Sequence, residues 1–137
     1  MKPSVEIRRL VTLPSDIQIL QNEAAEEGFR FVDKLIKEWE GATNRFARPG
    51  EILVGAFQGA RLVAVCGINI DPELENAAVC RLRHLYLLKE MRRQGIASRL
   101  VRHLLDAASG SFDCLSFRLR VEANSTNWRT MKFQKQR

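Results

Sequence analysis

The sequence predicts a mixed α/β domain in which helices pack on a sheet, in the order β-α-α-β-β-β-α-β-α. Strand-like apolar runs alternate with segments whose apolar residues recur every three or four positions, a spacing typical of helices. The length of 137 residues suits one domain, which we expect to cover residues 1–137. Hydrophobic residues make up 45% and charged residues 28%, which excludes a globally disordered chain.

The N-terminal part predicts one strand followed by helical structure. Residues 5–10 are typical of a short strand, and residues 15–40 carry apolar side chains at helical spacing. Gly28 interrupts this spacing, so the segment forms one broken helix or two short ones. Ser15 or Asp16 is the expected cap, because a short polar side chain can accept a hydrogen bond from the first helical turn.

The middle of the chain predicts three strands, over residues 52–57, 61–70 and 77–88. A hairpin turn at residues 58–60 joins the first two of these strands. The second strand is apolar almost throughout, which indicates burial on both faces. A long amphipathic helix is expected over residues 95–108.

The C-terminal part predicts a fifth strand over residues 114–121 and a weak terminal helix over residues 127–136. No apolar run approaches the roughly 20 residues that span a membrane, and the first residues lack the apolar stretch of a signal peptide. We therefore expect a cytoplasmic protein without a membrane partner.

Charge and cysteine usage narrow the function classes. The net charge of +6 favours an anionic partner, such as a phosphorylated small molecule, a nucleic acid or a membrane surface. Cys66, Cys80 and Cys114 form no CxxC pair, and the chain has only two histidines. This pattern favours buried free thiols over a disulfide framework, and no metal site is expected.

The segment most informative about function covers residues 85–98, where a strand leads through a short basic loop into a long helix. The start of a helix offers unpaired N–H groups and the positive end of the helix dipole. Gly95 lets the backbone approach a ligand closely, and Arg92 and Arg93 add positive charge. The loop therefore predicts a pyrophosphate site, although it is neither a P-loop nor a GxGxxG fingerprint.

This loop resembles a known motif. Arg92-Arg93-Gln94-Gly95-Ile96-Ala97 is similar to the acyl-CoA motif [RQ]-x-x-G-x-[GA] of the GNAT superfamily of N-acetyltransferases. The preceding Leu85-Tyr86-Leu87 resembles the strand end of that family, and the element order matches over about residues 4–136. The resemblance implies a GNAT-like fold and acetyl-CoA as co-substrate. It also implies transfer of the acetyl group to a primary amine by direct attack on the thioester.

The resemblance also implies the residues that bind the cofactor. The pyrophosphate would lie on the loop and the pantetheine arm along the preceding strand, and the backbone N–H near Leu87 would stabilise the oxyanion. A further contact comes from an asparagine after the fifth strand. The full set is Leu85, Tyr86, Leu87, Arg92, Arg93, Gln94, Gly95, Ile96, Ala97, Ser98 and Asn124, with Asn127 as the competing asparagine.

The C-terminal residues depart from the family pattern. Gln134 stands where the family often has a tyrosine that protonates the departing thiolate, so we expect reduced activity. The last two strands of the family are not expected here, which makes the fold C-terminally shortened and leaves an open sheet edge. An open edge favours a homodimer in which a partner chain completes the sheet.

The alternative function is a catalytically weak or inactive module that binds CoA or a nucleic acid. Nucleic-acid binding is disfavoured, because the sequence has no helix-turn-helix or zinc-finger spacing and no basic strand interleaved with aromatic residues. No catalytic residue is assigned. His84 on the strand before the loop is a candidate base, and Glu26 and Glu27 fall where the family lines its substrate cleft. The acceptor amine is not identified by the sequence.

Overall fold

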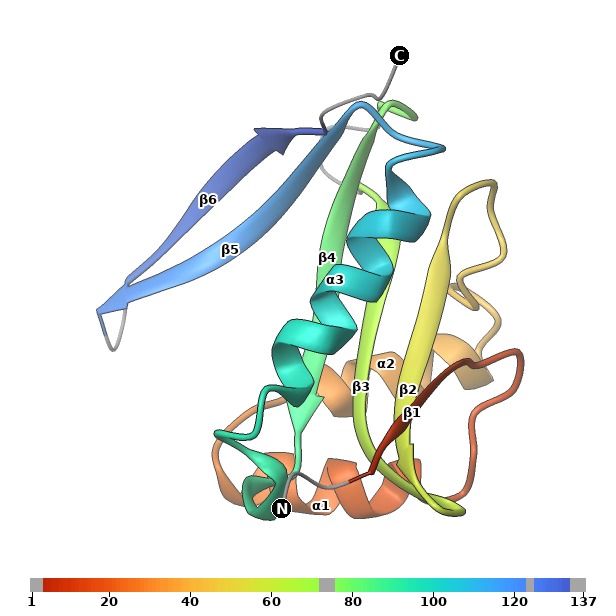
Figure 1. Cartoon of the computed structure of the whole chain (residues 1–137), viewed down its shortest axis with the longest axis vertical. Helices are drawn as coiled ribbons and strands as arrows, with labels where there is room; N and C mark the ends of the chain where they lie inside the picture. Colours follow the sequence, from red (N-terminus) through yellow and green to blue (C-terminus); the bar gives the residue numbers. More distant parts are fainter. Residues whose placement is uncertain (1–3, 72–75, 123–124, 134–137) are drawn as a thin grey trace.

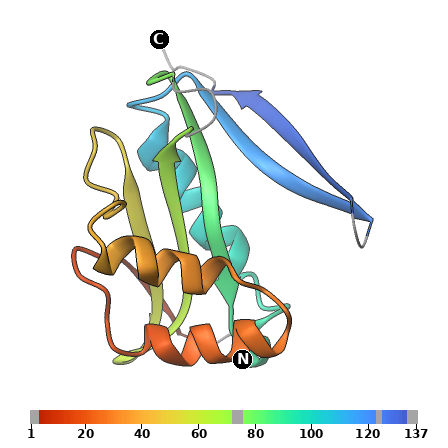
Figure 2. The same cartoon turned by 180° about the vertical axis from the view of Figure 1, so that it is seen from behind.

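The computed structural model describes residues 4–71, 76–122 and 125–133, and over residues 118–122 and 125–131 it describes the backbone. In this part of the chain one six-stranded sheet has the strand order β1-β2-β3-β4-β5-β6. Helices α1 and α2 cross one face of the sheet and helix α3 covers the other (Figures 1 and 2). The result is a three-layer α/β domain, as the sequence predicts.

The elements up to the fifth strand confirm the predicted order. Helix α1 ends and α2 begins on either side of Gly28, whose φ of 86° breaks the helix, so two short helices form instead of one. The strands are β1 (Glu6–Arg9), β2 (Ile52–Gln58), β3 (Arg61–Ile70), β4 (Val79–Leu87), β5 (Cys114–Glu122) and β6 (Ser125–Lys132). The helices are α1 (Ile17–Glu26), α2 (Phe31–Glu40), the 3-10 turn η1 (Lys89–Met91) and α3 (Ile96–Ala108).

The predicted cap of α1 is only half right. Asp16 stands at the N-cap position, but its carboxylate makes no hydrogen bond to the helix. Asp16 Oδ2 instead accepts a hydrogen bond from the N–H of Leu62 at 3.2 Å. The side chain therefore fixes α1 to the start of β3 and not to its own first turn.

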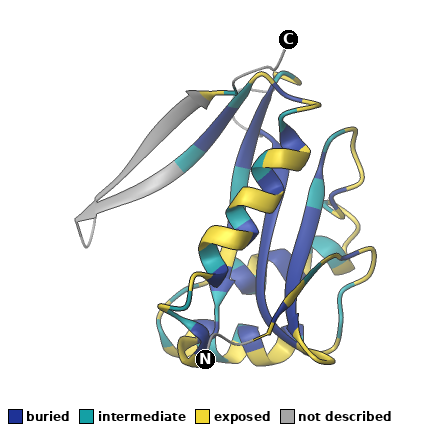
Figure 3. Cartoon of the chain, viewed as in Figure 1, coloured by how far each residue is buried: buried dark blue, intermediate teal, exposed yellow. Residues whose placement is uncertain are grey.

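The core lies on both faces of β3, as predicted from its continuous apolar sequence. Every residue of this strand after Arg61 is buried (Figure 3). Leu100 and Leu104 of α3 cover one face of the sheet, while Leu35 and Ile36 of α2 are buried on the helix that covers the other. Burial of this apolar surface is the main driving force for folding.

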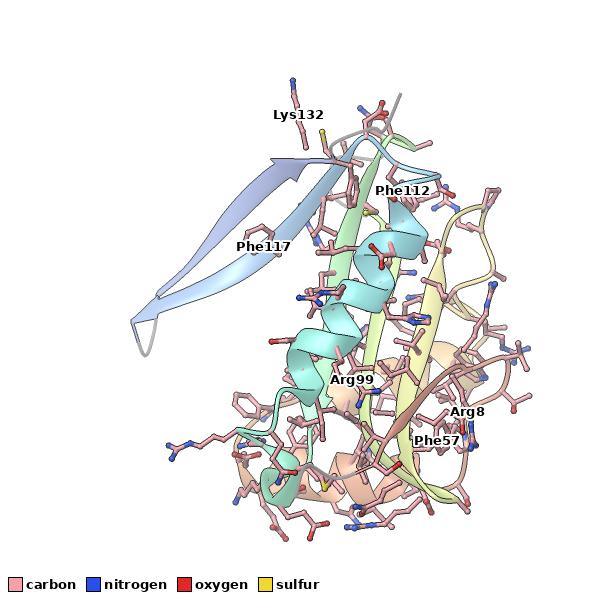
Figure 4. The ribbon with its side chains drawn as sticks, in the orientation of Figure 1. Arg8, Phe57, Arg99, Phe112, Phe117 and Lys132 are labelled. Atoms are coloured by element: carbon pink, nitrogen blue, oxygen red, sulfur yellow. The ribbon has the colours of Figure 1, made fainter. Side chains whose placement is uncertain are left out.

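Two arginines fasten the N-terminal strand. The guanidinium of Arg8 lies 4.7 Å from the ring centroid of Phe57 on β2 (Figure 4). Arg99 of α3 donates a hydrogen bond to the carbonyl oxygen of Val5 at 3.1 Å. Both contacts hold β1 at the sheet edge, where it pairs only with β2 among the described strands.

A β-bulge interrupts β4 near its middle. Val65 of β3 pairs with Tyr86 and Gly67 pairs with Arg83, so β4 carries an extra residue between these positions. His84 lies in the bulge with a φ of 61°. Bulges re-aim neighbouring side chains and are common beside functional sites.

The sheet splays open between β4 and β5. These two strands are parallel and pair only where residues 79–81 meet residues 114–116, and β5 then leans away with β6 (Figure 1). A buried ion pair holds the paired end, where Arg81 donates to Asp71 at 3.1 Å. Ser116 of β5 donates to the same carboxylate at 2.6 Å. This cluster joins β3, β4 and β5 at the point from which they diverge.

The predicted terminal helix over residues 127–136 is wrong. Residues 125–132 form β6, which pairs antiparallel with β5 along almost its whole length. Thr126, Trp128 and Thr130 favour strands, and the adjacent edge of β5 supplies backbone partners that a short helix would lack. Because β6 covers the edge of β5, the outer edge of the described sheet lies at β6. The homodimer stays a prediction.

Within the described ranges, no helix is long and apolar enough to cross a membrane.

We predict that Asp71→Asn destabilises the domain by about 3–5 kcal/mol, because it removes the charge of a buried carboxylate that binds both Arg81 and Ser116. Urea denaturation of the purified variant measures this loss. Glu6→Gln is the matched control, since it removes an ion pair with Arg8 that is exposed, and it should leave the midpoint unchanged. A loss below about 1 kcal/mol in Asp71→Asn would contradict the role of the buried pair.

Candidate functional site

The loop between β4 and α3 presents a series of unpaired backbone donors. Arg93 and Gly95 both have left-handed backbone conformations, with φ of 64° and 81°. Among the described residues, no acceptor takes the N–H groups of residues 93–98. A Cβ placed on Gly95 would meet no atom within 4 Å, so the space in front of the loop is open. Consecutive free N–H groups at a helix start form an anion-binding site.

Hydrogen bonds made by the backbone and side chain of Arg92 hold this loop in place. Its N–H bonds to the carbonyl oxygen of Lys89 at 3.2 Å, so the series of free donors begins at Arg93. Its Nε donates to the carbonyl oxygen of Leu87 at 3.0 Å. Both terminal nitrogens bind the carboxylate of Glu27, at 3.1 and 2.6 Å. The guanidinium therefore positions the loop, while the side chain of Arg93 is exposed.

Glu27 joins α1 to both β4 and the loop. Besides Arg92, it accepts a hydrogen bond of 2.6 Å from the hydroxyl of buried Tyr86, whose ring lies 5.5 Å from the Arg92 guanidinium. The hydrogen bonds from Arg92 and then from Tyr86 lower the pKa of Glu27 from 4.5 to about 2. Burial raises the pKa of Tyr86 above its ordinary value. The cluster is thus an ionised carboxylate held by a cation and a neutral phenol.

The edge of β4 next to the splay is open. The N–H of Leu88 donates to Val63 on β3 at 3.0 Å, and N–H groups alternate sides along a strand. The N–H groups of Leu85 and Leu87 therefore point away from β3, toward β5, which pairs with β4 only at residues 79–81. This edge can pair with an extended ligand.

A hollow runs along α3 from the same helix start. Its volume is about 450 Å³. Its lining residues lie on successive turns of the helix: Ala97, Ser98, Val101, Arg102, Leu105 and Asp106. Ala97 and Ser98 belong to the loop donors as well, so the hollow continues the anion site along the surface of α3.

His84 is poorly suited to act as a base. Its ring is buried beside Phe46, with 6.2 Å between the ring centroids. Burial, and next the charge of Arg83, lower the pKa of His84 to about 3. A base works best when its pKa lies near the working pH, so His84 is a weak candidate.

The structure thus brings residues 85–87 and 92–98 of the predicted site together. Asn124 and Gln134 lie outside the described residues, and Asn127 lies on β6, where only the backbone is described. The family resemblance placed Glu27 where the family lines its substrate cleft. It missed the ion pair because Glu27 and Arg92 are 65 positions apart. No group of three or more His, Cys, Asp or Glu side chains that could hold a metal occurs in the part of the chain that the structure describes.

A mixed sheet that splays beside a helix start with free N–H groups defines the class of acyl-CoA N-acyltransferase folds. The chain belongs to the GNAT family of acetyltransferases, whose family model matches residues 16–133. No curated protein sequence matches the chain.

Solved structures share the fold. A protein assigned as an acetyltransferase from Exiguobacterium sp. 255-15 is 21% identical, with a TM-score of 0.79 over 94% of this chain and 93% of that one. An acetyltransferase from Streptococcus agalactiae 2603 is 12% identical, with a TM-score of 0.68 over 88% and 76%. A GNAT family N-acetyltransferase from Escherichia coli, solved in complex with CoA, is 15% identical, with a TM-score of 0.61 over 82% and 61%.

We predict that Glu27→Gln lowers stability at neutral pH but not in strong acid. The pKa of Glu27 is lower in the folded state, so its ionised form stabilises the fold above about pH 4.5. This contribution is lost as the pH falls through about 2. Urea denaturation from pH 7 to pH 2 should show wild type and variant converging. The exposed neighbour Glu26, changed to Gln, is the control and should follow the wild type; a gap that does not change with pH would contradict the assignment.

Proposed function

We propose that the protein is an acetyl-CoA-dependent N-acetyltransferase that transfers the acetyl group to a primary amine. The observation that carries this proposal is the series of free N–H groups at residues 93–98, beside the open edge of β4. The family assignment and the CoA bound in the Escherichia coli neighbour support it.

Three features of the site fit three parts of acetyl-CoA. The free N–H groups of the loop suit the diphosphate, because they are donors at the positive end of the α3 dipole. The open edge at Leu85 and Leu87 suits the pantetheine arm, whose amides can pair as an added strand does. The hollow along α3 suits the adenosine, with Arg102 in its wall.

Two of the three cysteines, Cys66 and Cys80, are unsuited to carry the acetyl group, which favours direct transfer from the thioester to the amine. Burial raises the pKa of Cys66 and of Cys80 to about 12, so neither forms a thiolate that could carry the acetyl group. In direct transfer, the amine lone pair attacks the carbonyl carbon and the C–S bond then breaks. An N–H group on the open edge of β4 would stabilise the oxyanion. As the C–S bond breaks, the attacking nitrogen gives up its extra proton, which water carries to the departing thiolate, so the products are the amide and the free thiol of CoA.

The proton of the amine leaves to water in this proposal. An alkyl ammonium has a pKa of about 10 and attacks only after it loses a proton. Glu27 has a pKa of about 2 and His84 a pKa of about 3, so both are too weakly basic to take the ammonium proton efficiently.

The loop is tested by Gly95→Glu, which puts a negative side chain in front of the proposed diphosphate site. We expect CoA affinity, measured by titration calorimetry, to fall at least about 10-fold. Gly59→Glu is the matched control, because Gly59 also has a positive φ and open space but lies in the β2–β3 turn. Equal affinities of the two variants would contradict the placement of the site.

Acetyl transfer is tested by mass spectrometry of a panel of primary amines incubated with acetyl-CoA. We expect an acetylated amine, with kcat/KM rising tenfold per pH unit toward the pKa of that amine. The rise should show no break near the ordinary histidine pKa of about 6.5. Tight CoA binding without transfer to any amine would instead identify an inactive CoA-binding module.

A further inference from the structure

A second pocket lies on the α2 face of the sheet and is separate from the loop. Its volume is about 410 Å³, within the range of small-molecule sites. Its walls come from the end of α2, the segment before β2, the end of β3 and Arg83 of β4. None of its residues lines the hollow along α3 or belongs to residues 93–98.

The floor of this pocket is a satisfied polar network. The buried carboxylate of Glu51 accepts hydrogen bonds from the N–H groups of Arg48 and Ile70, at 3.1 and 2.9 Å, and from the Asn69 amide at 2.9 Å. Asn69 and Asn44 exchange two hydrogen bonds of 2.9 Å. Both oxygens of the Glu51 carboxylate therefore already have hydrogen-bond donors, and the network holds these pocket residues in place without a ligand.

Two charged side chains in the pocket wall, Glu38 and Arg83, have incomplete hydrogen bonding. No donor among the described residues hydrogen-bonds to the carboxylate of Glu38, whose side chain is 24% exposed. The nearest cation is Arg83, whose Nη2 lies 4.0 Å from Glu38 Oε2, beyond hydrogen-bond distance. The side chain of Arg83 is 16% exposed, and the only hydrogen bond of its guanidinium among the described residues is one of 3.3 Å to Asn69 Oδ1. Such poorly satisfied, partly buried charges gain from a ligand that completes their hydrogen bonds.

The charges of the wall indicate what the ligand carries. Arg45 and Arg48 line the pocket together with Arg83, while Glu38 is the one carboxylate of the wall that is not already hydrogen-bonded in the described structure. The pocket thus offers one site for an ammonium group and an excess of guanidinium groups for carboxylates. Arg83 and Glu38 lie close enough for one small zwitterion to reach both.

We propose that this pocket binds an acidic amino acid, with its ammonium on Glu38 and a carboxylate on Arg83. The remaining carboxylate faces Arg45 and Arg48. Because Arg83 directly precedes His84, the bound ligand would also restrain the bulge of β4.

The test compares L-glutamate with glutarate, which keeps both carboxylates but lacks the ammonium group. Titration of the ¹⁵N-labelled protein, followed by amide chemical shifts, should show L-glutamate binding with shifts at Asn44 and Asn69. Glu38→Gln should weaken L-glutamate at least about 10-fold without weakening glutarate, because only the ammonium loses its partner. Arg83→Met should weaken both ligands.

Glu26→Gln is the control variant, because Glu26 is an exposed glutamate on α1 outside the pocket, and it should bind both ligands as the wild type does. The proposal is wrong if L-glutamate causes no shifts in the pocket, or if L-glutamate and glutarate bind equally well. It is also wrong if Glu38→Gln binds L-glutamate as the wild type does. None of these readouts depends on acetyl-CoA, so they are independent of the proposed transferase activity.

Discussion

The geometry of the loop depends on the carboxylate of Glu27. Glu27 lies at the C-terminal cap of α1. Its carboxylate accepts a hydrogen bond from the hydroxyl of Tyr86 on β4 and hydrogen bonds from both terminal nitrogens of Arg92. Without it, Arg92 would lose two of the three side-chain hydrogen bonds that the described structure gives it. The loop would also lose one of its ties to α1, where the N–H of Lys89 to Glu23 is another. The ion pair is half-buried and bidentate, a geometry in which an ion pair contributes more than an isolated surface pair does. The basic character of the loop is thus partly structural: Arg92 shapes the site, and the backbone offers the donors.

A second constraint keeps the sheet closed at one end and open at the other. The cluster of Asp71, Arg81 and Ser116 joins β3, β4 and β5 where they pair. Below it, the bulge at His84 changes the course of β4, and β5 leans away with β6 (Figure 1). The open edge of β4 then leads toward the start of α3. A buried polar cluster and a local backbone irregularity together create a gap that a regular sheet would not have.

The sequence predicted what depends on local patterns and missed what depends on distant contacts. Apolar periodicity gave the elements through β5, and the single glycine of the motif located the loop. The terminal helix failed because the partner edge of β5, which no local pattern reveals, decides the conformation of residues 125–132. The roles of Glu27 and Asp71 were missed for the same reason, since their partners come from other elements. The pocket beside Glu38 is also lined by separate segments of the chain, so no single sequence motif predicts it.

The central claim is that the free N–H groups of residues 93–98 bind the diphosphate of CoA. The most direct test is calorimetric titration of the wild-type protein with acetyl-CoA and with S-acetylpantetheine, which has the same thioester arm but no diphosphate. Several charge-assisted hydrogen bonds predict that acetyl-CoA binds at least about 100-fold more tightly. Equal affinity for the two molecules would contradict the claim, because the thioester arm alone would then account for binding.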